Sequence, residues 1–485
     1  MYHYPPPLPA LGRSVRRLVV IMLFTVWPGS HVWAETVSAM QIFRSFDLPS
    51  RPDIPPGAKV DIRDHGARPG GEFLNTRSIA DAIKACADKG GGRVVVPAGV
   101  WLTGPVHFRS RIELHLEEGA ELLFSTNPTD YLPVVYQQRG GVRCYNYSPF
   151  VYARDCHDIA LTGKGVLNGQ GQSWWPWVLN QPGMVDLFKA NAGRTPVEKR
   201  IYGTPEQGVR PPFFQAIDCR DVLLEDVTFR NSPSWTVHPV WCENLTLRRV
   251  SVENPKHIQR KNGRGYGNNT DGIDPDGCRD VLIEDCVVNT GDDGICLKSG
   301  RDQDAWEVGR ACENVVIRRC RVLAGHGGFV IGSEMSAGVR NVLVQDCEFD
   351  GTDVGVRIKT VPGRRGVIQD IQIERVRMKN IRNQAIIVTK RYNGNSLDQP
   401  SDAPADMPAI RDILMRDLRC DSARIAIDLL GLPAYPLRDI TLENIVIDAR
   451  EAGRIEAVEN LTSRNVTVRV NGQVVNLEEK NPSLP

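Results

Sequence analysis

A nine-residue pattern recurs along the chain and constrains its fold more strongly than any other feature. The pattern reads apolar, any, Asn or Asp, apolar, any, apolar, any, any, apolar. Its copies begin at Cys219, Cys242, Cys278, Cys312, Val339, Ile368, Ile410 and Leu437, and degenerate copies begin at Cys156 and Val458. The starts of the regular copies are 23 to 42 residues apart, which is typical of a solenoid built from one structural unit per repeat.

Each copy has the alternating apolar positions, rich in β-branched residues, of a strand with one buried face. The Asn or Asp at the third position suits a bend before the strand, where its side chain can bond the local backbone. A coil that cannot bury its apolar face alone gains a core by stacking on the next coil. The sequence therefore predicts an all-β fold, a right-handed parallel β-helix of roughly ten coils.

The region before the repeats predicts an N-terminal cap of about residues 58–125. Asn75 is expected to cap a helix over Ile79 to Ala87. The apolar face of this helix consists of Ile79, Ala82, Ile83 and Cys86. We expect the helix to close the open end of the solenoid and to cover the edge of the first coil. The first strands are expected within residues 93–99 and 112–122.

The N-terminus has the composition of a secretory signal peptide. Basic residues up to Arg17 precede an apolar run over residues 18–27 that is too short to span a bilayer. Val32 and Ala34 then offer small residues before a cleavage site at Glu35. We therefore predict a signal peptide over residues 1–34 and a single β-helix catalytic domain over residues 35–485. The mature chain would be secreted or periplasmic and free of the membrane; an uncleaved membrane anchor is the alternative.

Charge and cysteine usage narrow the function classes. The net charge of +1 gives no electrostatic case for nucleic-acid binding. Several of the 12 cysteines share repeat positions that Val or Ile occupies in other copies. This equivalence favours small buried side chains stacked inside the solenoid, rather than disulfides or metal ligands.

Four unusual segments fall in the middle coils: residues 269–274 (NTDGID), 291–293 (GDD), 325–327 (GHG) and 357–359 (RIK). Asp292 and His326 each lie fourteen residues after the start of a repeat copy. Equivalent positions on successive coils stack roughly 4.8 Å apart, so these two side chains should be neighbours. Asp271 is expected about one coil earlier, and Arg357 about one coil later with Lys359 on the same side of its strand.

This patch would hold three carboxylates, one imidazole and two cations. Glycosidic cleavage needs one protonated carboxyl group to donate to the leaving oxygen and one carboxylate to activate water or attack. Neighbouring carboxylates would raise one pKa and keep that acid protonated. Asp292 and Asp293 can both serve such a site only if the chain bends between them. An Asp-rich set of turns, or a calcium site, is the alternative.

Together the four segments resemble the signature of glycoside hydrolase family 28, the polygalacturonases, and the stretch after Gly325 is similar to bacterial, often exo-acting members. The resemblance implies hydrolysis with inversion, no cofactor and no metal. It implies that Asp292 is the general acid, that Asp271 and Asp293 position and activate the water, and that His326 tunes the acid. It further implies that Arg357 and Lys359 bind a galacturonate carboxylate.

Two further side chains are candidate substrate contacts. Asn269 opens the first motif, and Glu334 is a carboxylate near the site, for which a structural role is the alternative. The loop over residues 256–268 carries four cations that could grip an acidic chain, and the insertion over residues 174–210 could wall off one end of a groove. Each of these segments could instead serve only solvation or packing.

The sequence thus predicts a monomeric, pectin-degrading hydrolase of α-1,4-galacturonosidic bonds in an acidic polysaccharide, with a lean toward exo action. A galacturonidase of rhamnogalacturonan side chains or a rhamnogalacturonan hydrolase is one alternative. A calcium-dependent pectate lyase of the same fold is another. A uronan-binding solenoid without catalysis is the non-enzyme alternative.

Overall fold

The structure, a computed structural model, describes residues 41–262, 264–392 and 406–475. The predicted signal peptide over residues 1–34 lies outside them, and the single domain over residues 35–485 stays a prediction. Within the described ranges, no helix combines the length and the apolar composition needed to cross a membrane.

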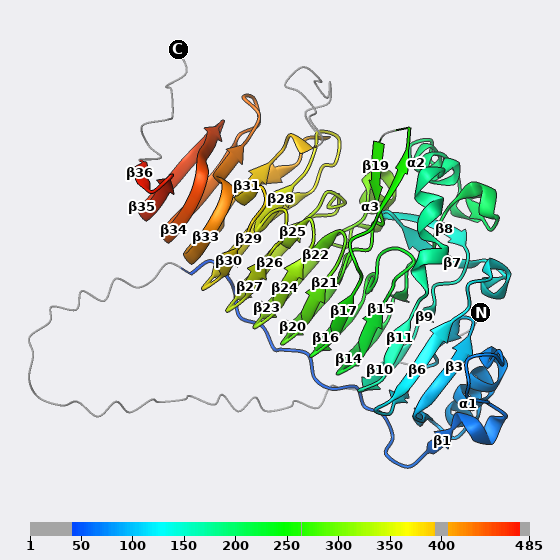
Figure 1. The fold of residues 1–485 in the computed structure, drawn as a ribbon. Coiled ribbons are helices and arrows are strands. Elements are labelled where there is room, and N and C mark those ends of the chain that lie inside the picture. The colour runs from blue at the N-terminus through cyan, green and yellow to red at the C-terminus, as the bar shows by residue number, and fades with distance from the viewer. Residues whose placement is uncertain (1–40, 263, 393–405, 476–485) are drawn as a thin grey trace, which may run out of the picture. The chain divides into compact units, whose positions relative to one another are not determined.

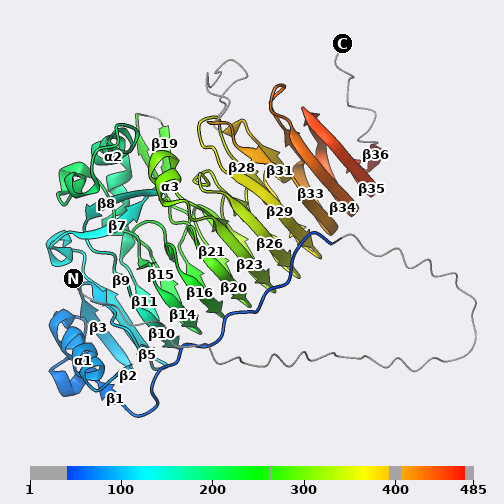
Figure 2. The same cartoon turned by 180° about the vertical axis from the view of Figure 1, so that it is seen from behind.

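The described chain winds into stacked coils whose strands form three parallel ladders (Figures 1 and 2). The first ladder contains the repeat strands. In stacking order these are β1 (Lys59–Asp61), β2 (Gly92–Val96), β5 (Ile112–Leu116), β10 (His157–Gly163), β14 (Arg220–Glu225), β16 (Glu243–Arg248), β20 (Arg279–Glu284), β23 (Cys312–Arg318), β26 (Val339–Gln345), β29 (Val367–Glu374), β33 (Ile413–Leu430), β34 (Leu437–Glu456) and β35 (Val458–Val470).

The second ladder has shorter strands. They are β3 (Gly99–Thr103), β6 (Ala120–Phe124), β11 (Val166–Asn168), β15 (Thr228–Arg230), β17 (Ser251–Glu253), β21 (Val287–Asn289), β24 (Arg321–Ala324), β27 (Glu348–Asp350) and β30 (Arg377–Lys379), and the ladder continues into β33. The third ladder holds β4 (Val106–His107), β9 (Val151–Arg154), β13 (Phe214–Ile217), β22 (Asp293–Leu297), β25 (Gly327–Ile331), β28 (Val356–Lys359) and β31 (Gln384–Thr389). The predicted right-handed parallel β-helix is confirmed, and it extends somewhat beyond the roughly ten coils expected from the repeat.

The third repeat position forms a polar ladder between coils. Its residues have left-handed backbones, with φ of 53° at Asn244, 57° at Asp280 and 55° at Asn314. Asn and Asp tolerate this conformation better than other side chains. Their side chains bond the equivalent residue of the neighbouring coil: Asn244 Nδ2 donates to Asp221 Oδ1 at 3.0 Å, and Asn314 Nδ2 donates to Asp280 Oδ1 at 2.7 Å. The bend was predicted, but the expected bond to the local backbone was wrong.

Apolar side chains from the ladders fill the inside of the coils in one continuous core. All twelve cysteines are buried free thiols. Those at the first repeat position, such as Cys242 and Cys278, are stacked among Val and Ile side chains in this core. The prediction that the cysteines serve as small buried side chains is therefore confirmed.

The N-terminal cap is helix α1 (Thr76–Asp88), which packs on β1 and β2 at the end of the stack (Figure 1). Its predicted apolar face is buried in the core. The expected cap was wrong in its chemistry, because the Asn75 side chain does not bond the helix. Asn75 instead accepts from the Arg68 amide at 2.7 Å and donates to the Leu102 carbonyl at 3.0 Å, so it joins the preceding loop to the first coils.

Several elements lie outside the ladders and group on one side of the stack (Figures 1 and 2). They are hairpin β7 (Val135–Arg139) and β8 (Val142–Asn146) with β12 (Ile201–Tyr202), helices α2 (Pro182–Ala192) and α3 (Asp302–Val308), and hairpin β18 (Ile258–Lys261) and β19 (Arg264–Gly267). Short 3-10 helices are η1 (Ile62–His65), η2 (Pro128–Tyr131), η3 (Gly171–Ser173), η4 (Trp175–Leu179), η5 (Val197–Lys199) and η6 (Pro205–Gln207), and short strands are β32 (Ala409–Ile410) and β36 (Gln473–Val475). The hairpins β7–β8 and β18–β19 and the helices α2 and α3 stand beside the third ladder, which carries the candidate site.

Candidate active site

The third ladder sets the order of the predicted site residues along the stack. Between β13 and β22 it continues as isolated bridges, from Val237 to Ile273 and from Ile273 to Ile295. Ile295 then pairs with Phe329, and Phe329 with Val356. Asp271, Asp292 with Asp293, His326, and Arg357 with Lys359 therefore lie on four successive coils, as the repeat spacing predicted.

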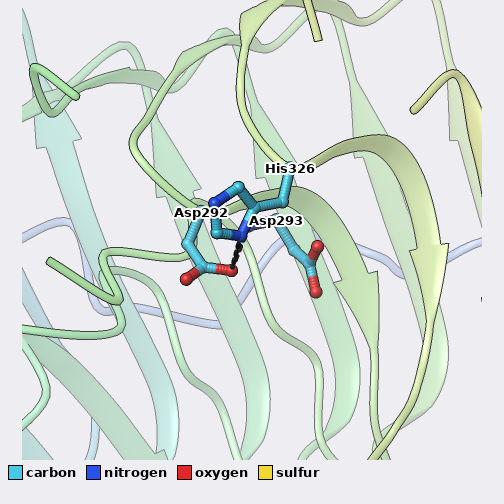
Figure 3. A group of neighbouring side chains, drawn as sticks. All are labelled: Asp292, Asp293 and His326. Atoms are coloured by element: carbon cyan, nitrogen blue, oxygen red, sulfur yellow. Dashed lines mark hydrogen bonds and ion pairs between the residues drawn. The ribbon is translucent and has the colours of Figure 1, made fainter. Parts of the chain in front are cut away.

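Asp292, Asp293 and His326 form the centre of the site (Figure 3). His326 Nδ1 lies 3.0 Å from Asp292 Oδ1, and the Asp293 amide donates to the same oxygen at 2.9 Å. The chain bends at Gly291 and Asp292 before β22 begins at Asp293, so the bend required for both aspartates is present. Gly325 is needed beside them, because a Cβ there would lie 2.6 Å from the Asp292 carbonyl oxygen.

The cations of β28 face Asp293. Lys359 Nζ lies 2.6 Å from Asp293 Oδ2, and Arg357 Nη1 lies 3.8 Å from Asp293 Oδ1. Both cations also lie over the ring of Tyr392, at 4.9 Å for Lys359 and 5.3 Å for Arg357. The two side chains point the same way, as their spacing of two residues on one strand predicted.

Asp271 is held from two sides and is 2% exposed. Asn269 Nδ2 donates to its Oδ1 at 3.1 Å, and Lys298 Nζ donates to its Oδ2 at 3.3 Å. Lys298 also lies 3.6 Å from Glu334 Oε2 and 4.1 Å from the centre of the Trp235 ring. Sequence reasoning missed Lys298, although a lysine directly after the apolar run over residues 295–297 was a usable signal.

The acid–base balance differs from the sequence-based expectation. Burial and the charge of Asp292 raise the pKa of Asp271 to about 7. Burial also opposes ionisation of Asp292, but the hydrogen bond from His326 and its charge outweigh burial and lower the pKa of Asp292. Burial lowers the pKa of His326, and Asp292 more than offsets this, so the pKa of His326 is raised. Burial also raises the pKa of Asp274, so raised carboxyl pKa values belong to Asp271 and Asp274, and not to Asp292, the acid that the resemblance implies.

A cavity of about 360 Å³ connects these groups. Seven of the predicted site residues line it: Asn269, Asp271, Asp292, Asp293, His326, Glu334 and Lys359. The eighth, Arg357, lies next to the cavity because its Nη1 is 3.8 Å from Asp293 Oδ1. Sequence reasoning missed Arg139, Trp235 and Tyr392, which also line it. Arg139 and Trp235 lie outside the four motifs, so no local pattern identified them. All eight predicted site residues are brought together.

Glu334 sits in a ring of cations at the cavity wall. Burial would raise its pKa, but Lys298, Arg301 and Arg364 outweigh burial and lower the pKa to about 2. Arg301 Nη1 lies 3.9 Å from Glu334 Oε1. Glu334 is therefore an ionised carboxylate that holds Lys298 in place, and it also reaches the cavity.

Asp292, Asp293 and His326 offer ligand atoms within 4.8 Å of one another, which is close enough for a metal ion. The donor set fits calcium poorly, because calcium takes six to eight oxygen ligands. In this group one donor is an imidazole, and Lys359 already neutralises Asp293 at 2.6 Å. The arrangement fits proton transfer between hydrogen-bonded groups better than a calcium centre.

Comparison with known proteins adds independent findings. Residues 197–468 match the profile of Glycosyl hydrolases family 28. The chain is 30% identical over 398 residues to a "Probable polygalacturonase" of Vitis vinifera, an alignment that covers 80% of this chain and 74% of the relative. It is 29% identical over 376 residues to an "Exo-poly-alpha-D-galacturonosidase" of Dickeya chrysanthemi, covering 72% of this chain and 60% of that relative.

A solved structure shares the fold closely. The crystal structure of an exopolygalacturonase from Thermotoga maritima superposes with a TM-score of 0.77 at 35% sequence identity. The match covers 86% of this chain and 94% of that one. The likeness therefore extends over most of both chains.

Proposed function

The chain belongs to family 28 of the glycosyl hydrolases, and on that premise we propose that it hydrolyses the α-1,4-galacturonosidic bonds of polygalacturonate. The observation that carries the proposal is the grouping of Asp271, Asp292 and Asp293 around His326 in one cavity. Cations stand beside these acids on β28. A neutral glycan would not need them, whereas a uronic acid carries a carboxylate that a guanidinium or an ammonium binds.

Asp292 donates the proton to the leaving oxygen in this proposal. Asp292 and His326 share a hydrogen bond of 3.0 Å, and together they hold one proton. That proton lies on His326 before reaction, because the pKa of His326 is raised and that of Asp292 is lowered. In the reaction His326 Nδ1 passes this proton to Asp292, and the neutral carboxyl group so formed donates it to the leaving oxygen as that oxygen gains negative charge.

Asp271 is the proposed general base. A carboxylate with a pKa of about 7 is a stronger base than an ordinary one, and it is ionised to a useful degree near neutral pH. Asp293 offers an oxygen within 4.8 Å of Asp292. Acid and base in inverting glycosidases stand roughly 6.5–9.5 Å apart, so Asp293 is better suited to position the water. Inversion would be read from the anomer that proton NMR detects first.

The cavity wall favours exo action. Met184 and Phe188 of α2 line the cavity, so the insertion over residues 174–210 reaches the site. The loop over residues 256–268 packs against this insertion: Lys261 Nζ donates to the Leu179 carbonyl at 3.1 Å, and the rings of Trp175 and His257 stack at 5.4 Å. Because the two segments contact each other beside the catalytic coils, they would prevent a polymer from extending through the cavity.

Chromatography of early products from polygalacturonate tests the proposal. Monomer or dimer alone is expected from an exo-acting hydrolase, whereas a ladder of oligomers would show endo action. A product that absorbs in the ultraviolet through a new double bond would instead show a lyase. Unchanged polymer after prolonged incubation would contradict hydrolysis altogether. We further propose that the mature chain is exported and acts as a monomer, which fractionation and light scattering would check.

A further inference from the structure

Arg139 is a buried cation that the proposed mechanism does not use. It ends strand β7 at the tip of hairpin β7–β8 and is 2% exposed. Three other arginines in the described part of the chain are comparably buried, and each has polar partners. Arg200 bonds Asp304 at 2.7 Å, Arg364 donates to Ser333 at 3.1 Å, and Arg210 donates to two carbonyl oxygens.

Arg139 has no such partner. No described residue accepts a hydrogen bond from its guanidinium or lies within ion-pair distance of it, and its Nε is buried and unpaired. Its guanidinium lies over the Trp235 ring, whose centre is 5.3 Å away. An unpaired buried cation costs several kcal/mol in solvation energy, so this arrangement is stable only if the surrounding structure enforces it.

The surrounding structure does enforce it. The Gln215 side chain donates to the Gln138 carbonyl at 2.8 Å and accepts from the Gln138 amide at 3.3 Å, which fixes the residue before Arg139. On the other side, the Gly141 carbonyl accepts from the Arg301 amide at 2.9 Å. Gly141 packs so closely there that a Cβ would lie 2.8 Å from the Arg301 Cβ. The hairpin tip is therefore rigidly held against the coil that carries Asp292.

Arg139 is aimed into the cavity that holds the catalytic aspartates, which it lines together with Trp235. The backbone of Trp235 stands on the coil before Asp271, four coils from Arg357 along the third ladder. At roughly 4.8 Å a coil, the two backbone positions are about 19 Å apart. The cations of β28 and the guanidinium of Arg139 thus border the row of aspartates on opposite sides.

We propose that Arg139 binds the carboxylate of a second galacturonate unit, on the opposite side of the cleaved linkage from Arg357 and Lys359. A guanidinium can form two parallel hydrogen bonds with a carboxylate, so it would read that unit as a free acid rather than an ester. Trp235 provides the flat surface beside it. This inference rests on the proposed function and adds a second point at which the enzyme selects de-esterified substrate.

The test compares digalacturonate and trigalacturonate with their methyl esters, using kcat/KM for each. The wild-type protein is expected to prefer the acids. Arg139→Gln should reduce this preference by about 10- to 100-fold, because a hydrogen bond to a charged group is lost only for the acids. Arg139→Lys should restore part of it. Arg143→Gln is the matched control: Arg143 lies on the same hairpin but bonds Asp304 and Glu307, and the preference should stay as in wild type.

Stability separates binding from a role in the fold. Removing an unpaired buried cation should leave the Tm of Arg139→Gln equal to that of wild type or higher. Adding digalacturonate should raise the Tm of Arg139→Gln by less than it raises the Tm of the wild-type protein. Equal losses on acids and esters, or an unchanged preference in folded Arg139→Gln and Arg139→Lys proteins, would overturn the inference alone. A wild-type protein without activity on any oligogalacturonate would instead remove the proposed function, and this inference with it.

Discussion

Two sets of stacked charges in this molecule have the same spacing and opposite character. On the outer face of the first ladder, acidic and basic side chains alternate from coil to coil. In register these are Glu225, Arg248, Glu284, Arg318, Glu374 and Arg416, with the neutral Gln345 standing between Arg318 and Glu374. On the third ladder, acid follows acid, because Asp271 on one coil is succeeded by Asp292 and Asp293 on the next.

The difference shows in the pKa values of the carboxyl groups. Burial opposes ionisation of Glu284, but hydrogen bonds from Arg248 and Arg318 outweigh it and lower the pKa to about 2. In contrast, burial and Asp292 raise the pKa of Asp271 to about 7. Burial and the sign of the neighbouring charges together therefore decide whether a coil-stacked carboxylate is permanently ionised or can exchange a proton near neutral pH. The same solenoid geometry supports a stabilising ladder on one face and acid–base chemistry on another.

The largest expected effect comes from removing the proposed proton donor. Asp292→Asn should lower kcat on polygalacturonate by about 10²- to 10⁴-fold, the range that general acid catalysis contributes. The fold should persist, because the asparagine relieves repulsion with Asp271. Reducing-end release measures the activity and circular dichroism the fold. Near wild-type kcat in a folded variant would contradict the role of Asp292.

The pH profile tests the proposed base. A base must be ionised to act, so kcat/KM should rise about tenfold per pH unit below the pKa of Asp271, which is about 7, and fall again at higher pH, where His326 loses the proton that the acid needs. If Asp271 were the acid instead, kcat/KM would fall through the same pH range. Initial rates on trigalacturonate between pH 4 and 9 would distinguish the two.

Lys298 provides a way to move that profile. Its charge lowers the pKa of Asp271, so Lys298→Met should shift the rising limb to higher pH. The ladder variant Glu284→Gln serves as control, because Glu284 lies on another face and should leave the limb in place. An unshifted limb in folded Lys298→Met would show that Asp271 does not set it.

The sequence could predict the coils and the residues stacked on them, but not the side chains that reach the cavity from outside the repeat. The nine-residue repeat identified the strands, the coil order and the stacking of Asp292 on His326, because equivalent positions in a solenoid are neighbours by construction. It could not predict Arg139 and Trp235, because they reach the cavity from a hairpin and a bridge segment that carry no motif. The position of Arg139 depends on the packing of α2 and α3 against β8 of the hairpin.

The direction of the carboxyl pKa shifts also depended on detail beyond the repeat. The sequence indicated that closely spaced aspartates would raise one pKa. Which aspartate has the raised pKa depended on the 3.0 Å hydrogen bond between His326 and Asp292 and on the burial of Asp271. In the same way, Asn75 stands at the predicted cap position, but its side chain does not bond the helix, because it has partners in a loop that the helix pattern does not describe.

A smaller effect is expected when one charge is removed from the row on the outer face of the first ladder. Glu284 accepts hydrogen bonds from Arg248 at 2.6 Å, Arg318 at 2.7 Å and Arg319 at 2.9 Å. Glu284→Gln should cost about 1.5–3 kcal/mol of stability at pH 7, seen as a lower urea midpoint, with kcat unchanged. A carboxyl group with a lowered pKa stabilises the fold above its unfolded pKa, so the difference from wild type should shrink as the pH falls from about 4.3 toward 2. A difference independent of pH would show that ionisation of Glu284 does not matter.

The smallest effect is expected at the edge of the same ladder, where an extended N-terminal segment over residues 41–57 crosses the coils (Figure 2). Arg51 Nη2 lies 2.9 Å from Glu225 Oε2, and the Arg51 side chain is 59% exposed. Glu225 keeps Arg248 and Arg249 as partners when Arg51 is lost. Arg51→Ala should therefore lower stability by only about 0.2–1 kcal/mol, and less in high salt, because exposed ion pairs are screened. A loss as large as that of Glu284→Gln would mean that the segment holds the coils together and that the ladder alone does not.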